Sequence, residues 1–249
     1  MNYKLIIQYD GTRYDGWQRQ GNTTNTIQGK LEAVLERMEE APCEVFGSGR
    51  TDAGVHAYGQ VANVHLKRDW KPEEILAYVN RYLPDDIEVV KVSRAEERFH
   101  ARLNATKKTY CYQIGIGHSK HVFSRKYCYH VEEPLNIEEM QQAAECLVGT
   151  HDFQSFCSSK RSKKSTVRTI YEAKVELDPA DKMLKCIFVA DGFLYNMVRI
   201  LTGTLIEVGL GKRKAYEMEN ILEAKDRSAA GVTAPAQGLV LVSVEYDRK

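Results

Sequence analysis

The first half of the chain carries alternating strand and helix patterns. Two runs of apolar residues at the three- and four-residue spacing of a helix predict helices over residues 26–40 and from Pro72 onward. Stretches rich in strand-forming residues and bounded by turn residues predict four strands, at residues 4–9, 43–46, 60–67 and 87–92. The predicted order is therefore strand, helix, strand, loop, strand, helix, strand.

The second half mixes the same two kinds of element. Predicted strands cover residues 109–115, 167–177, 184–190 and 239–246, and predicted helices cover residues 137–148, 194–208 and 215–225. A domain usually takes about 100 to 200 residues, so this length allows one large core or two small ones. We predict an α+β protein of two domains, residues 1–104 and 105–249, each with an antiparallel-rich sheet flanked by helices, and with an active-site cleft between them.

Composition indicates a soluble globular protein. Hydrophobic residues make up 43% and charged residues 28% of the 249 residues, and no apolar run has the length of a membrane span. The chain enters a strand pattern at Lys4 without the features of a signal peptide. We therefore expect no membrane association and a cytoplasmic location.

Cysteine and histidine spacing gives no sign of a metal site or a disulfide framework. The six cysteines are at least eleven residues apart and include no C-x-x-C pair, so most are expected to be small core residues. Seven histidines are scattered along the chain. Among them, His56 alone lies in the segment discussed next, where packing or hydrogen bonding is expected of it.

The most distinctive segment is the glycine-rich run GSGRTDAGVHA at residues 47–57. It lacks the lysine and spacing of a phosphate-binding P-loop, and the dinucleotide pattern G-x-G-x-x-G fails because the glycine after Gly49 is Gly54. A calcium loop needs several oxygen ligands, and only Asp52 is present. Taken alone, the loop leaves two interpretations open. Either Asp52 is a reaction centre, or it bonds nearby backbone N–H groups in an Asx-type turn.

This run resembles the active-site signature of the bacterial tRNA pseudouridine synthase A family, in which the aspartate is catalytic. Further segments match in the family's order, namely YDG at 9–11, GWQRQ at 16–20, RFHAR at 98–102, KKTYCY at 107–112, GTHDF at 149–153, GFLYNMVR at 192–199 and TAPAQGL at 233–239. The chain departs from the family pattern at Lys108 and Thr109, where arginine is frequent, and at Ile200, where a polar residue often occurs. These departures leave open a shifted range of tRNA targets.

The resemblance implies an isomerase with Asp52 as its catalytic group. Arg199 would form an ion pair that keeps Asp52 ionised, and helical spacing would place Tyr195 and Arg199 on one face. Tyr110 would stack beside a flipped uridine, while Arg50 would touch RNA phosphate or prop open the duplex. Isomerisation needs no cofactor and no metal. Asp52 acts either by covalent addition or by proton removal that gives a glycal, and the sequence does not choose between them.

The implied substrate is the tRNA anticodon stem-loop, modified at positions 38 to 40 by a homodimer with a basic groove. The net charge is only +1, so the basic residues must be unevenly distributed. Residues 158–168 contain five basic residues and no acid, which indicates either an RNA contact or a solvated loop. Trp17 and Gln18 either border the groove or pack. Other candidate RNA contacts are Lys107, Lys108, Arg168, Lys212, Arg213 and Lys214.

Two other functions compete with the isomerase. One is a catalytically silent tRNA-binding protein on the same scaffold, which the requirement for Asp52 would distinguish. The other is an RNA glycosidase that hydrolyses the same bond, which is disfavoured because such enzymes normally use two carboxylates.

Overall fold

The computed structural model describes residues 1–158 and 165–247, which form two compact units. The first unit contains Met1–Thr106 together with the chain from Val240 onward, and the second contains Lys107–Leu239. The division after Thr106 lies two residues from the domain boundary expected from the sequence. The closing strand, which the sequence-based division assigned to the second domain, pairs with a strand of the first unit.

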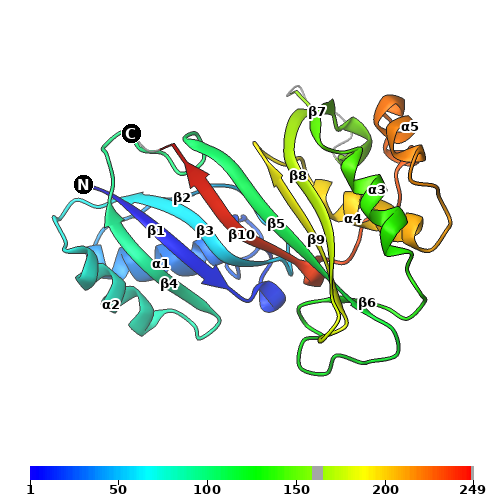
Figure 1. The fold of residues 1–249 in the computed structure, drawn as a ribbon. Helices are drawn as coiled ribbons and strands as arrows, with labels where there is room; N and C mark the ends of the chain where they lie inside the picture. The colour runs from blue at the N-terminus through cyan, green and yellow to red at the C-terminus, as the bar shows by residue number, and fades with distance from the viewer. Residues whose placement is uncertain (159–164, 248–249) are drawn as a thin grey trace. The chain divides into compact units, whose positions relative to one another are not determined.

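The first unit is built on a mostly antiparallel sheet (Figure 1). Its strands are β1 (Asn2–Tyr9), β2 (Val45–Gly47), β3 (His56–His65), β4 (Ile87–Arg94) and β10 (Leu239–Tyr246). They are ordered β4-β1-β3-β10, β2 pairs with β3, and β10 runs parallel to β3. Alternate side chains of β1 are fully buried, at Tyr3, Leu5 and Ile7, as a strand with one face on the core requires.

Two helices supply the other half of this core. In α1 (Ile27–Glu39) the side chain of Thr26 accepts a hydrogen bond from the Gly29 N–H at 3.2 Å and so caps the amino end. Helix α2 (Pro72–Tyr82) starts at a proline, whose missing N–H costs nothing in the first turn. The apolar stripes predicted for both helices are buried, which confirms the two helices and the strand–helix order of this half.

The second unit contains the other five strands of the ten-stranded sheet. Its strands are β5 (Ala105–Ile116), β6 (Tyr129–Val131), β7 (Gly149–Asp152), β8 (Val167–Asp178) and β9 (Met183–Ala190). They are ordered β6-β5-β9-β8-β7, and only β6 runs parallel to its neighbour. The strand predicted at residues 109–115 is confirmed as part of β5, in which Tyr112 and Ile114 are fully buried. Strands β6 and β7 were not predicted, because runs of three and four residues are too short to show a period.

The second unit also contains three helices, namely α3 (Ile137–Glu145), α4 (Met197–Gly209) and α5 (Glu217–Ala224) (Figure 1). Helix α3 contacts both α4 and β8. Helix α4 is buried on nearly all sides, and a Cβ at Gly203 would lie 1.9 Å from the Val232 carbonyl oxygen. Both units thus combine helices with antiparallel-rich sheets, which confirms the α+β class.

The predicted start of α4 at residue 194 is wrong. Asn196 has a left-handed backbone with φ 61°, so the helix begins at Met197 and Tyr195 lies outside it. The four-residue helical spacing that was expected to place Tyr195 and Arg199 on one face therefore does not apply. Tyr195 is 58% exposed.

Within residues 1–158 and 165–247, none of the helices combines the length and the apolar character needed to cross a membrane. The same residues include no cluster of three or more His, Cys, Asp or Glu side chains suited to a metal ion.

Candidate active site

The glycine-rich segment forms the connection between β2 and β3. The two strands pair from Val45 opposite Val64 to Gly47 opposite Ala62, so residues 48–55 close a hairpin that carries Asp52. The Val55 N–H donates to the Asp52 carbonyl oxygen at 3.1 Å, and Gly54 has φ 77°. Asp52 is therefore the first residue of a tight turn whose third position favours glycine.

Residues on both sides of Asp52 are fixed by the last residue of β1 and by the segment that follows it. The hydroxyls of Thr51 and Tyr9 lie 2.8 Å apart in a buried hydrogen bond. The Trp17 N–H donates to the Thr51 carbonyl oxygen at 3.0 Å, and the Gly54 N–H donates to the Tyr14 carbonyl oxygen at 3.3 Å. Burial raises the pKa of Tyr9 to about 12, so its hydroxyl stays neutral in this bond.

Two close approaches make the fit between this segment and the loop tight. A Cβ at Gly47 would lie 2.5 Å from the indole of Trp17, which is only 1% exposed. A Cβ at Gly16, where φ is 93°, would lie 2.6 Å from the Thr51 carbonyl oxygen. Trp17 is thus a packing residue. The sequence had left open whether Trp17 borders an RNA groove or packs, and its burial favours packing.

His56 makes a hydrogen bond at the end of the same loop. Its Nδ1 accepts from the Gly11 N–H at 3.0 Å, and the side chain is buried. This confirms the expectation that His56 packs or hydrogen-bonds.

Arg50 lies on the exposed side of the loop. Its Nε donates to the side-chain oxygen of Gln18 at 3.1 Å. The backbone before it is fixed by Gln60, whose Oε1 accepts from the Ser48 hydroxyl at 2.7 Å and whose Nε2 donates to the Gly49 carbonyl at 3.0 Å. The loop therefore presents an exposed guanidinium from a fixed backbone.

In the second unit, Arg199 lies in the first turn of α4 and is held by two hydrogen bonds. Its Nε donates to the Ala234 carbonyl oxygen at 2.8 Å, and its Nη1 donates to Asn196 Oδ1 at 2.9 Å. The Ala234 N–H in turn donates to the Arg199 carbonyl oxygen at 3.1 Å. Residues 233–239, one of the sequence motifs, thus fix the direction of the guanidinium.

Tyr110 and Tyr112 of β5 have different surroundings. The Tyr110 ring meets Phe193 edge to face, with centroids 5.1 Å apart. Tyr112 is fully buried and its hydroxyl donates to the Pro235 carbonyl oxygen at 2.7 Å. Tyr112 is therefore a core residue, whereas Tyr110 lies against the motif that contains Arg199.

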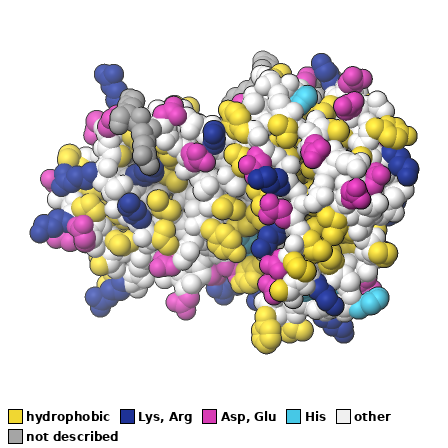
Figure 2. Space-filling view, viewed as in Figure 1, with side chains coloured by type: hydrophobic (Ala, Val, Ile, Leu, Met, Phe, Trp, Pro, Cys, Tyr) yellow, Lys and Arg dark blue, Asp and Glu magenta, His cyan; other side chains and the backbone are white. Residues whose placement is uncertain are grey.

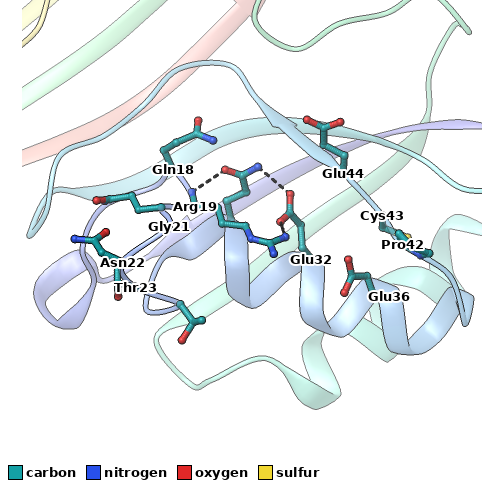
Figure 3. Close-up of a pocket in the computed structure, with 13 residues that line it drawn as sticks. Gln18, Arg19, Gly21, Asn22, Thr23, Glu32, Glu36, Pro42, Cys43 and Glu44 are labelled. Carbon is teal, nitrogen blue, oxygen red and sulfur yellow. Dashed lines mark hydrogen bonds and ion pairs between the residues drawn. The ribbon is translucent and has the colours of Figure 1, made fainter.

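A pocket of the first unit, with a volume of about 1,090 Å³, lies beside residues 18–20 of the segment that supports the Asp52 loop (Figure 3). At its base Gln28 joins three elements, since Oε1 accepts from the Arg19 N–H at 2.9 Å and Nε2 donates to Glu32 Oε1 at 2.8 Å. Glu32 also accepts from the Val45 N–H at 3.1 Å and pairs with the Arg19 guanidinium at 3.3 Å. This network fixes residues 16–20 against α1 and the start of β2.

Comparison with known proteins identifies the family of this chain. The family model described as tRNA pseudouridine synthase matches residues 5–104 and 143–247. A tRNA pseudouridine synthase A from Bacillus sp. (strain KSM-64) is 50% identical over 245 residues, covering 98% of this chain and 99% of the relative. The chain belongs to the tRNA pseudouridine synthase family. A relative from Bacillus anthracis, named tRNA pseudouridine synthase A 2, is 46% identical with the same coverage.

Not every basic residue singled out from the sequence is available for the RNA that this family modifies. Arg213 pairs with Glu207 at 2.6 Å and donates to the Ala229 carbonyl. Arg168 donates to the carbonyl oxygens of Ser165 and Val167. Most of the basic run at residues 158–168, including Lys160, Arg161, Lys163 and Lys164, lies outside the described residues.

Sequence reasoning missed the residues that hold the family's signature groups in place. Tyr9 and the Ala234 carbonyl belong to motifs that were recognised, yet no role was assigned to them. The sequence signal for these supporting residues was their position within the recognised motifs. In this chain, residues 9–20 fix the backbone around Asp52, and residues 233–239 hold the Arg199 side chain.

Proposed function

We propose that the chain isomerises uridine to pseudouridine at positions 38 to 40 of the tRNA anticodon stem-loop, with Asp52 as the catalytic group. Family membership supports the general activity, which is the isomerisation of uridine to pseudouridine in tRNA. The observation that supports Asp52 is its place at the start of a turn fixed through Thr51 and Gly54. A catalytic carboxylate needs such fixed geometry, because a displacement of about 1 Å can cost about 100-fold in rate.

The reaction is balanced without any co-reactant. The bond between C1′ and uracil N1 breaks, the base turns, and C1′ bonds to C5. The C5 proton leaves to solvent, and N1 takes up a proton. Asp52 takes part either by covalent addition or by removing a sugar proton to give a glycal, and no oxidant, reductant or metal is required by either route.

The remaining residues bind the substrate in this proposal. Arg199 supplies a cation that binds the substrate, and Tyr110 stacks on the flipped uridine. The rigid surroundings of both support this, since Arg199 is bonded to Ala234 and Asn196, and Tyr110 rests on Phe193. Arg50 contacts RNA phosphate or holds the duplex open, for which its exposed guanidinium is suited.

We further propose that the chain acts in the cytoplasm, where tRNA is processed, as a homodimer and without a cofactor. Sedimentation at micromolar concentration should give a mass of twice 28.4 kDa. A monomer mass under conditions of full activity would remove the dimer from the proposal.

Mapping pseudouridine in the tRNA pool tests the target positions. Cells lacking this protein should lose pseudouridine at positions 38 to 40 and keep it elsewhere, and the gene restored in trans should return it. A Thermoanaerobacter relative named tRNA pseudouridine synthase A, 44% identical, is a useful complementing control. An unchanged map would instead favour a tRNA-binding protein without this activity.

A further inference from the structure

A long stretch in the middle of the chain contains no acidic residue. Between Glu97 and Glu132 there are seven lysines and arginines, four of the seven histidines and no aspartate or glutamate. With a total charge of only +1, such a stretch is a local excess of positive charge. Much of it is strand β5, and its most exposed part is the loop of residues 117–127 that leads to β6.

This loop is built from two consecutive turns. The Ser124 N–H donates to the His121 carbonyl at 2.9 Å, and the Tyr127 N–H donates to the Ser124 carbonyl at 2.8 Å. The Arg125 guanidinium donates to the Val122 carbonyl inside the loop. Its end is held by Gln113, whose Nε2 donates to the Tyr127 carbonyl oxygen at 3.1 Å.

The loop is also joined to the segment that holds Arg199. The side-chain amide of Gln237 donates to the Cys128 carbonyl at 3.0 Å, and Gln237 lies three residues after Ala234. His121, with φ 43°, turns its ring onto Gly115, where a Cβ would lie 2.7 Å from the imidazole. With His121 turned inward, the next two residues of the turn remain outside.

Those two residues are apolar and exposed. Val122 is 56% exposed and Phe123 is 99% exposed, the largest exposure of any large hydrophobic side chain among the described residues. Lys120, Arg125 and Lys126 are exposed within three residues of Phe123. In Figure 2, hydrophobic and basic side chains lie at the lower edge of the second unit, where Figure 1 draws this loop.

We propose that residues 117–127 form an RNA-binding loop in which Phe123 stacks on an unpaired base of tRNA and Lys120, Arg125 and Lys126 contact phosphates. An exposed aromatic ring in a segment with several cations is the combination by which proteins hold single-stranded or looped RNA. The charge of the loop favours a polyanion as its occupant, since residues 117–127 contain three lysines and arginines and no aspartate or glutamate. This inference rests on the proposed function, because it assigns a second contact to the same tRNA.

Stacking is tested by exchanging Phe123 while keeping its apolar character. Phe123→Leu should weaken binding of unmodified tRNA about 5- to 100-fold, the range expected for one lost base–aromatic stack. Phe123→Trp is the matched control and should bind as well as the original chain. Equal affinity for Phe123→Leu and the original chain would overturn the stacking role.

Phosphate contact is tested by the dependence of affinity on salt. The double variant Lys120→Gln with Lys126→Gln should make the slope of log affinity against log salt less steep by about 1 to 2, since each phosphate contact contributes about 0.7 to 0.9. Arg125 is kept because it donates to a carbonyl within the loop. Lys174→Gln, which removes a lysine paired with Glu172 at 2.9 Å, is the control and should leave the slope unchanged. An unchanged slope in the double variant would overturn the charge role.

A second copy of this chain is the other possible occupant of the loop. If Phe123→Leu lowers the sedimenting mass in the absence of tRNA, the loop is an interface between copies and the proposal is wrong. The loop proposal and the proposed function can be contradicted independently. If the loop variants bind tRNA normally and the original chain makes pseudouridine, only the loop proposal is wrong. If tRNA binding depends on the loop but the original chain makes no pseudouridine, only the isomerase activity is wrong.

Discussion

The hydroxyl of Tyr9 lies 2.8 Å from the hydroxyl of Thr51, the residue directly before Asp52. Both side chains are buried, so this bond links the end of β1 to the turn that carries the carboxylate. The bond involves no atom of Asp52, but it fixes the residue directly before it in the chain. Tyr9 is therefore a positioning residue rather than a catalytic one.

Removing this hydroxyl should slow the reaction without weakening tRNA binding. In Tyr9→Phe the Thr51 hydroxyl loses a buried partner, and we expect the single-turnover rate to fall about 3- to 30-fold because the turn is less well fixed. The free energy of unfolding should fall by about 1 to 2 kcal/mol in urea denaturation. Tyr14→Phe is a matched control, since the Tyr14 hydroxyl bonds Asp86 instead. A change in tRNA affinity with an unchanged rate would contradict the positioning role.

The contact between Gly47 and Trp17 should tolerate no side chain. In Gly47→Ala the new methyl would start 2.5 Å from the indole, so we expect the free energy of unfolding to fall by about 1 to 3 kcal/mol. Gly21→Ala is the control, because nothing lies within 4 Å of that position. Its stability should change by less than about 0.5 kcal/mol. Equal stability of the two variants would show that the Trp17 ring moves easily.

Glu39 should make the stability of the chain depend on pH. Burial raises the pKa of this carboxyl, but the Trp70 N–H at 2.7 Å and the N–H groups of Arg68 and Lys67 outweigh it, so the folded-state pKa lies below the usual 4.5. Its stabilising contribution is present above the unfolded-state pKa and is lost as the pH falls through the folded-state pKa.

We therefore expect Glu39→Gln to lower the free energy of unfolding by about 1 to 3 kcal/mol at pH 7. The difference from the original chain should shrink as the pH falls below 4.5. Glu40→Gln, which removes an exposed carboxylate paired with Arg68 at 2.7 Å, is the control and should change stability by less than about 1 kcal/mol. A Glu39→Gln difference that is constant from pH 7 to pH 3 would contradict the assignment.

Full activity should require a guanidinium group at position 199. Arg199→Lys keeps the charge but cannot bond both Ala234 and Asn196 in the same geometry, so we expect it to retain part of the rate. Arg199→Ala should lose about 100-fold or more, as when a group that stabilises charge at a reacting centre is removed. Wild-type rates in the alanine variant would remove Arg199 from the site.

Much of the fold could be predicted from the sequence, and the reasons for the misses are local. The helices of the first unit follow from buried stripes such as that of α1, and β5 follows from the alternation of Tyr112 and Ile114. The start of α4 was missed because Asn196 adopts a left-handed backbone that no periodicity reveals. The closing strand was assigned by its place in the chain, whereas its parallel pairing with β3 is a long-range contact.

For the candidate site, the sequence predicted the residues but not the contacts that hold them. Asp52, Tyr110, Arg199 and Arg50 were reached through motif resemblance, which names residues but not the contacts that hold them. The Tyr9–Thr51 bond and the hydrogen bond from Arg199 to Ala234 join residues 42 and 35 positions apart in the chain. Such pairs become visible only when the backbone is in place.

Tritium release from tRNA labelled with [5-³H]uridine measures the central claim most directly, because the C5 proton leaves only when the new C–C bond forms. The original chain should release tritium, and Asp52→Asn should release none above background while binding the same tRNA with unchanged affinity. Release at the original rate by Asp52→Asn would contradict the account.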